Sequence, residues 1–278
     1  MTLSKNFETT KNLVAKLTSI QRLDKDLGDI NNKVKPYIEL NDLIREISPL
    51  DDYIQESAKW NACTNCKLCE TRVKVVFGGG SVKPRLVVIG EAPGPNEDTV
   101  GVPFVGKTGS FFREVIEKVG INTEEVYFTN AVACIPKDSI SMPFRTPTAQ
   151  EISACSGRLR FVYEHILPSA DAVIMTGKIG FAAWMAIEKN DQSFVDTVLS
   201  AKFSAKENLG WHVGLPSGKP AYFIYHPSYI ERQGRSKTVT QPWIDDIKAV
   251  RSYLNDKQLK NNTDRQTHDH SGVKNAQG

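Results

Sequence analysis

The chain has 278 residues, 40% of them apolar and 24% charged, which is ordinary for a globular protein and unlike a disordered or fibrous chain. It contains no run of about 18 apolar residues and starts without the apolar stretch of a signal peptide, so we expect no membrane span and a cytoplasmic protein. A net charge of +3 neither requires nor excludes a nucleic-acid partner.

Residues 1–58 are predicted to form a helical N-terminal extension. Apolar residues recur at steps of three and four from Leu13 to Val34, the spacing of one face of a long amphipathic helix. A second apolar stripe runs from Ile38 to Ile47. Such faces dock on their own domain or bind a partner or a second copy of the chain, and the sequence leaves both alternatives open.

The segment WNACTNCKLCETR holds three of the five cysteines, Cys63, Cys66 and Cys69, and the others are Cys134 and Cys155. In a cytosolic protein, clustered cysteines indicate a metal site more than disulfides. A C-x2-C pair places two thiolates on one metal or cluster, and two later cysteines can complete a set of four. Zinc and iron-sulfur clusters both accept four thiolates, so the spacing does not choose between them.

A glycine-rich loop, GEAPGPNEDTVGVPFVGKTG, occupies residues 90–109. It follows a predicted buried strand from Arg85 to Gly90 and precedes a predicted helix, SFFREVIEKVG. The loop therefore lies at the carboxyl end of a sheet, where open α/β folds bind ligands. Its glycine spacing fits neither of the common phosphate-binding loops, so nucleotide binding is not favoured.

Three further strands alternate with helices along the rest of the chain. EEVYFTNAVAC gives a strand ending near Asn130, ADAVIMTG gives the next, and PAYFIYHPSYI gives a fourth whose end carries His226. Thr148 is a plausible cap for a helix over residues 149–167, and a helix over residues 241–254 is the last element. The polar tail of residues 256–278 is predicted to be disordered.

This alternation predicts a three-layer α/β/α domain over residues 59–255, with a central four-stranded, mainly parallel sheet. The carboxyl ends of its strands would bring the GEAPG loop, Asn130 and His226 to one edge. That convergence makes the glycine-rich loop a candidate site.

Six sequence features resemble the family 4 uracil-DNA glycosylases, the iron-sulfur branch of that superfamily. They are GEAPG followed by Glu97-Asp98 and G-x-PFVG, a strand ending in Thr-Asn, a cysteine soon after it, and a late His-Pro-Ser. The resemblance spans about Ala62 to Leu254. It implies an α/β/α fold, a four-iron four-sulfur cluster, and excision of uracil from DNA.

The resemblance also implies a ligand set for the cluster. The ligands correspond to Cys63, Cys66, Cys134 and Cys155, with Cys69 spare. In a competing assignment, Cys66 and Cys69 form the first pair.

Roles for the substrate site follow from the same resemblance. Phe104 would stack on a flipped uracil, Asn130 would bind its Watson–Crick edge, and His226 would donate to its O2. Alternatively, Phe104 could be a core side chain, Asn130 a cap of its strand, and His226 a buried structural histidine. Other branches of the superfamily carry an Asp where this chain has Ala92, beside the base. The remaining acids Glu91 and Glu97 are therefore candidates for activating water, although Glu97 could shape the pocket instead.

Predicted DNA contacts come from Lys107, Ser228, Arg232 and Arg235, each of which could also be an ordinary surface residue. The linker KDSISMPFRTP, residues 137–147, is longer and less basic than the family pattern. Together with the N-terminal extension, it leaves two alternatives to uracil excision. One is a glycosylase of the same fold that removes a modified pyrimidine, for example in defence against foreign DNA, and the other is a non-catalytic iron-sulfur DNA-binding protein.

Overall fold

A computed structural model describes residues 50–200 and 203–271, and the side chains of the C-terminal helix up to residue 260. The chain divides into two units, Met1–Glu56 and Ser57–Gly278. Residues 50–61 form a helix. The predicted amphipathic helices of residues 1–49 lie outside the described residues, and so does their predicted role in docking or self-association.

The second unit is built on a six-stranded sheet with the order β1-β3-β2-β4-β6-β5. Its four central strands are those that the sequence predicts, and they run parallel to one another. Every residue in them is buried, as expected for a parallel sheet covered on both faces. These strands are β2 (Leu86–Gly90), β3 (Val126–Asn130), β4 (Ala172–Thr176) and β6 (Ala221–Ile224).

Two short antiparallel strands, which the sequence did not predict, flank the parallel centre. β1 (Gly79–Gly80) pairs with β3, and β5 (Gly210–His212) pairs with β6, so the sheet has six strands rather than four. A methyl group on Gly80 would lie 2.1 Å from the backbone oxygen of Val126, so this edge pairs only because it is glycine. Strands of two and three residues are too short for an alternating pattern to be recognised.

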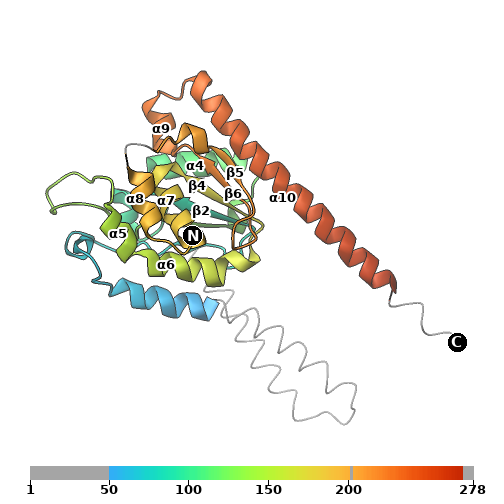
Figure 1. Ribbon diagram of the computed structural model, residues 1–278, viewed down its shortest axis with the longest axis horizontal. Coiled ribbons are helices and arrows are strands. Elements are labelled where there is room, and N and C mark those ends of the chain that lie inside the picture. Colours follow the sequence, from blue (N-terminus) through green and yellow to red (C-terminus); the bar gives the residue numbers. More distant parts are fainter. Residues whose placement is uncertain (1–49, 201–202, 272–278) are drawn as a thin grey trace, which may run out of the picture. The chain divides into compact units, whose positions relative to one another are not determined.

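Helices cover both faces of the sheet, which confirms the predicted α/β/α architecture (Figure 1). On one face α4 (Lys107–Lys118) and α10 (Lys237–Ser271) bury a core that includes Phe112 and Trp243. On the other face α7 (Gly177–Glu188) packs against the central strands, with α6 (Ser156–Phe161) and α8 (Ser193–Leu199) beside it. The short α9 (Pro227–Arg232) follows β6 and contacts α4.

The helix predicted over residues 149–167 is interrupted. It consists of α5 (Ala149–Ala154), α6 and a π-helical turn, Val162–Ile166, and Cys155 lies at the first junction. Thr148 caps α5 as predicted: its Oγ1 accepts from the N–H of Glu151, and the Glu151 carboxylate accepts from the N–H of Thr148. This reciprocal pair is a capping box.

Three segments differ from the sequence-based expectation. The glycine-rich loop contains the helix α3 (Pro95–Val100), α8 lies in a segment without a predicted element, and α10 continues as helix to Ser271 through residues predicted to be disordered. Residues 272–278 lie outside the described part of the chain. Among the described residues, no helix has the length and apolarity needed to cross a membrane.

A candidate active site at the carboxyl ends of the central strands

Asn130 and Phe104 meet at the end of β2. Gly90 and Asn130 are register partners, and a methyl group on Gly90 would lie 2.2 Å from Oδ1 of Asn130 and 2.8 Å from Cζ of Phe104. Only glycine therefore leaves room for both side chains there. Asn130 is 4% exposed, and none of the hydrogen bonds found among the described residues involves its side-chain amide. An amide left free at a strand end can donate to a ligand and accept from it.

The backbone of Phe104 is strained. Its φ of 58° lies in the left-handed region, which bulky residues rarely adopt. The Arg113 guanidinium donates from Nε to the Phe104 carbonyl oxygen at 3.0 Å and from Nη2 to that of Pro103 at 3.1 Å. The ring of Phe104 lies 5.3 Å, centroid to centroid, from that of Phe128. The surrounding structure thus fixes this aromatic ring against the end of β2.

Glu97 holds the same loop from the other end. Its buried carboxylate accepts backbone N–H groups from Gly94 at 3.1 Å, Val105 at 3.0 Å and Gly106 at 2.6 Å. These three backbone donors come from both ends of the loop, so the carboxylate links the two ends through hydrogen bonds. The geometry therefore favours a pocket-shaping role for Glu97 over activation of water.

His226 immediately precedes α9, and its neighbours fix its ring. Nδ1 accepts the backbone N–H of Ser228 at 3.2 Å and lies 2.8 Å from Ser228 Oγ, which in turn accepts from Nη1 of Arg232 at 3.0 Å. A backbone N–H can only donate, so Nδ1 is the unprotonated nitrogen and the proton of the neutral ring is on Nε2. Burial, followed by the charge of Arg232, lowers the pKa of His226 to about 4.

Glu91, the first residue after β2, is half-buried. Burial raises the pKa of its carboxyl group, and a hydrogen bond from Thr146 and the charge of Arg232 oppose that rise. The charge of Arg232 thus lowers the pKa of both Glu91 and His226. The neighbouring Ala92 is half-buried as well.

Several predicted DNA contacts have partners within the protein. Ser228 contacts Nδ1 of His226, and Arg232 donates to the Ser228 hydroxyl. Arg235 binds Glu231 at 2.9 Å and lies 3.9 Å over the Phe111 ring. Lys107 is exposed at the start of α4. Contact of these four residues with DNA remains a prediction.

The profile of the Uracil DNA glycosylase superfamily matches residues 77–248. The chain belongs to this superfamily. It is 33% identical over 198 residues to the Type-4 uracil-DNA glycosylase of Thermotoga maritima, covering 71% of this chain and 92% of that protein. The proteins of the same name from Archaeoglobus fulgidus and Sulfurisphaera tokodaii are 33% and 30% identical, over 65% and 60% of this chain and 82% and 73% of theirs.

Four of the five cysteines of this uracil-DNA glycosylase superfamily member line one pocket. Cys69 does not line that pocket, so the geometry favours the predicted ligand set over the competing pair that includes Cys69. Trp60, Asn65 and Arg72 contribute to its wall. The four cysteines are Cys63, Cys66, Cys134 and Cys155.

The chemistry of this pocket fits a cationic group. Burial raises the pKa of the Cys66 thiol and raises that of Cys134 to about 12, and the neighbouring thiols oppose ionisation further. Arg72 donates to Cys134 Sγ at 3.5 Å and to the Cys63 carbonyl oxygen at 2.7 Å. Four thiolates this close need a strong positive charge among them, which a metal centre supplies.

Within the described residues, no group of three or more His, Cys, Asp or Glu side chains is arranged to hold a metal ion. The assignment of a four-iron four-sulfur cluster to these cysteines therefore rests on the resemblance to the family.

Arg158 is a site residue that the sequence analysis missed. It is fully buried on α6, and its guanidinium donates to the backbone oxygens of Phe77 at 2.6 Å and of Asn130, and to Oγ1 of Thr129. These bonds fix the end of β3, which carries the Asn130 side chain. The sequence gives no local signal for this role, because Arg158 and its acceptors meet only in the folded chain.

Proposed function

We propose that this superfamily member is a DNA glycosylase that hydrolyses the N-glycosidic bond of a uracil flipped out of DNA, leaving an abasic site. The observation that carries the proposal is the neutral His226. Ser228 contacts its Nδ1, which leaves the ring proton on Nε2. Among the described residues, Asn130 presents an unpartnered amide at the same edge of the sheet. The names of the relatives, Type-4 uracil-DNA glycosylase, support the choice of uracil.

Asn130 and Phe104 would recognise the base. The Asn130 amide would donate N–H to uracil O4 and accept N3–H on its oxygen, and cytosine presents the reverse pattern. The Phe104 ring, held in its strained conformation, would stack on the base, and such stacking contributes roughly 1–3 kcal/mol. A nucleotide must leave the helix stack to reach these groups.

Bond cleavage would place negative charge on the departing base. The electron pair of the C1′–N1 bond moves onto uracil, and much of the charge develops at O2, where the Nε2–H of His226 would donate a hydrogen bond. Water adds its oxygen to C1′, and its proton passes first to the Glu91 carboxylate and finally to the released base or solvent. A nearby carboxylate also stabilises positive charge on the sugar. A donor like that of His226 lowers the activation free energy by about 3–4 kcal/mol.

The four pocket cysteines would hold a four-iron four-sulfur cluster. Bound there, it would cross-link the segment after residue 61 to the chain beyond β3 and to the junction of α5 and α6, as a structural group. Cys63 and Cys66 come from the first region, Cys134 from the second and Cys155 from the third. The chemistry at C1′ would be carried by the side chains at the strand ends.

One assay tests the function. The purified chain is incubated with single- and double-stranded oligonucleotides that carry uracil, thymine or a modified cytosine, and abasic sites are revealed by alkaline cleavage. We expect release of uracil, and a rate about 10²–10³ lower for His226→Ala with DNA affinity retained. Release from modified bases alone would overturn the choice of uracil, and binding without any release would overturn the enzymatic role.

A further inference from the structure

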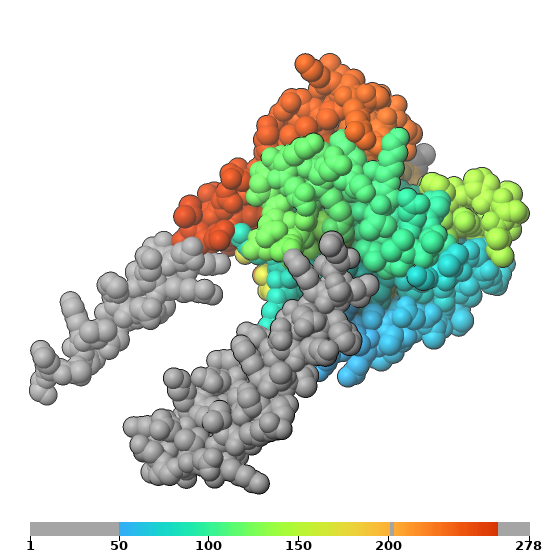
Figure 2. Space-filling view, turned by 180° about the vertical axis from the view of Figure 1, so that it is seen from behind, coloured from blue at the N-terminus to red at the C-terminus, as the bar shows by residue number. Residues whose placement is uncertain are grey.

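The linker between Cys134 and α5 exposes three large apolar side chains. Ile140 is 78% exposed, Met142 51% and Phe144 57%. Figure 1 shows this yellow-green loop projecting from the domain beside α5, and the space-filling view in Figure 2 shows a yellow-green prominence at its edge. Apolar side chains gathered on one exposed segment mark an interaction surface.

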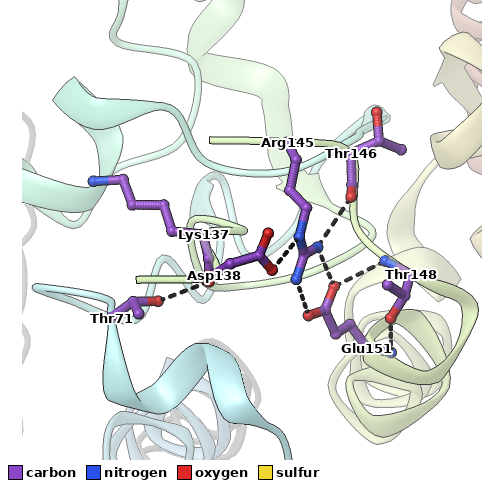
Figure 3. Close-up of polar contacts among 7 residues, drawn as sticks. All are labelled: Thr71, Lys137, Asp138, Arg145, Thr146, Thr148 and Glu151. Atoms are coloured by element: carbon purple, nitrogen blue, oxygen red, sulfur yellow. Dashed lines mark hydrogen bonds and ion pairs between the residues drawn. The ribbon is translucent and has the colours of Figure 1, made fainter. Parts of the chain in front are cut away.

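Arg145 holds this loop in one conformation (Figure 3). Its backbone N–H donates to the Pro136 carbonyl oxygen at 2.8 Å, which joins the two ends of the loop. Its guanidinium makes a two-point pair with Glu151 at 2.8 and 2.9 Å and donates from Nε to Asp138 at 2.7 Å. The apolar side chains are thus presented by a braced loop, so less conformational entropy is lost when they bind.

The loop ends at the candidate active site. Thr146, two residues after Phe144, lies near enough to Glu91 to lower the pKa of its carboxyl group. The Lys137 side chain at the start of the loop points away from the Arg145 cluster (Figure 3). A ligand bound to the loop would therefore contact apolar side chains beside the site and lie near the positive charge of Lys137.

DNA around an extruded nucleotide has this combination of properties. Its neighbouring bases have lost a stacking partner, and its phosphates are anionic. Proteins that unstack a base step commonly insert Phe, Ile or Met as a wedge. We propose that residues 137–146 form a DNA wedge in which Ile140, Met142 and Phe144 replace lost stacking beside the extruded nucleotide. The inference rests on the proposed function and adds a contact separate from the His226 loop.

The test uses the full-length protein and a duplex with 2-aminopurine beside a 2′-fluoro-deoxyuridine, which resists hydrolysis. We expect 2-aminopurine fluorescence to rise on binding, because the base loses its stacking. The combined variant Ile140→Ser, Met142→Ser and Phe144→Ser should lose most of that rise and bind duplex at least about tenfold more weakly, within the range for base contacts. Val213→Ser, at an apolar residue 72% exposed on another surface, is the matched control and should change neither quantity.

Parallel uracil release by the unaltered protein separates the two proposals. If the unaltered protein releases no uracil, the proposed function fails. If it releases uracil and the triple variant matches it in fluorescence and duplex affinity, the wedge is wrong. Unchanged DNA binding together with loss of a co-purifying protein would assign the loop to a protein partner instead. Phe144→Ser alone provides the comparison if the triple variant melts at a lower temperature.

Discussion

Ser228 places two groups against the same nitrogen of His226: its backbone N–H lies 3.2 Å and its Oγ 2.8 Å from Nδ1. The order His-Pro-Ser makes this possible, because Pro227 opens α9 without an N–H and the next residue turns back toward the ring. The imidazole is thereby committed to one tautomer, with its only proton on Nε2.

Ser228→Ala tests that relationship. The variant removes the hydroxyl contact and keeps the backbone N–H, so we expect the single-turnover rate of uracil excision to fall about three- to tenfold, the effect of one hydrogen bond. His226→Ala should lose far more. The exposed Ser252→Ala is the control and should leave the rate unchanged. A Ser228→Ala enzyme as slow as His226→Ala would mean that the hydroxyl itself acts on substrate.

The pH dependence separates the roles of His226 and Glu91. With its pKa lowered to about 4, His226 stays neutral from about pH 5 to 8 and cannot cause a loss of rate there. The carboxyl group of Glu91 has a pKa raised above its usual 4.5, so it gains a proton at a higher pH than an exposed glutamate. If the ionised form is required, the rate falls as the pH drops through that raised pKa.

Glu91→Gln should therefore lower the rate at pH 8 by about 100-fold and abolish the acid limb of the pH profile. The measurement is single-turnover excision between about pH 4.5 and 8.5, with DNA binding followed in parallel. An acid limb that persists in Glu91→Gln with a midpoint near the ordinary value for histidine, about 6.5, would assign the titration to His226 instead.

Glu97→Gln distinguishes a structural from a catalytic carboxylate. An amide in this position must turn its NH2 group toward at least one of the three backbone N–H donors, leaving a buried donor unpaired at a cost of about 1–3 kcal/mol. We expect the melting temperature to fall by about 2–4 °C per kcal/mol, together with weaker substrate binding. Glu114→Gln, on the exposed face of α4, is the control. Lost activity with an unchanged melting temperature would restore a catalytic role for Glu97.

Local signals account for the parts of the fold that the sequence predicted. The central strands are uninterrupted buried apolar runs, and Thr148 precedes a helix with Glu151 three residues later, so each pattern is complete within a few residues. The positions of Asn130 and His226 follow from the strand ends, because parallel strands share one carboxyl edge.

Long-range contacts explain what the sequence did not predict. Arg158 and Asn130 are far apart in the chain, and the guanidinium finds its acceptors only when α6 packs behind β3. Glu97 looks like a free acid in the sequence, and its role depends on how the glycine-rich loop folds back on it. Arg145 likewise acquires its partners from both ends of the linker.

The cysteine pocket gives the last prediction. Cys63 lines it and Cys69 does not, although they are six positions apart in one short segment. Cys69→Ala should yield a brown protein with the iron and sulfide content and melting temperature of the unaltered chain. Cys63→Ala should lose colour, iron and sulfide together and melt at a lower temperature, because the cluster links three separate segments. Zinc with no sulfide in the unaltered protein would contradict the cluster, and loss of iron from Cys69→Ala would show that this cysteine takes the place of Cys63.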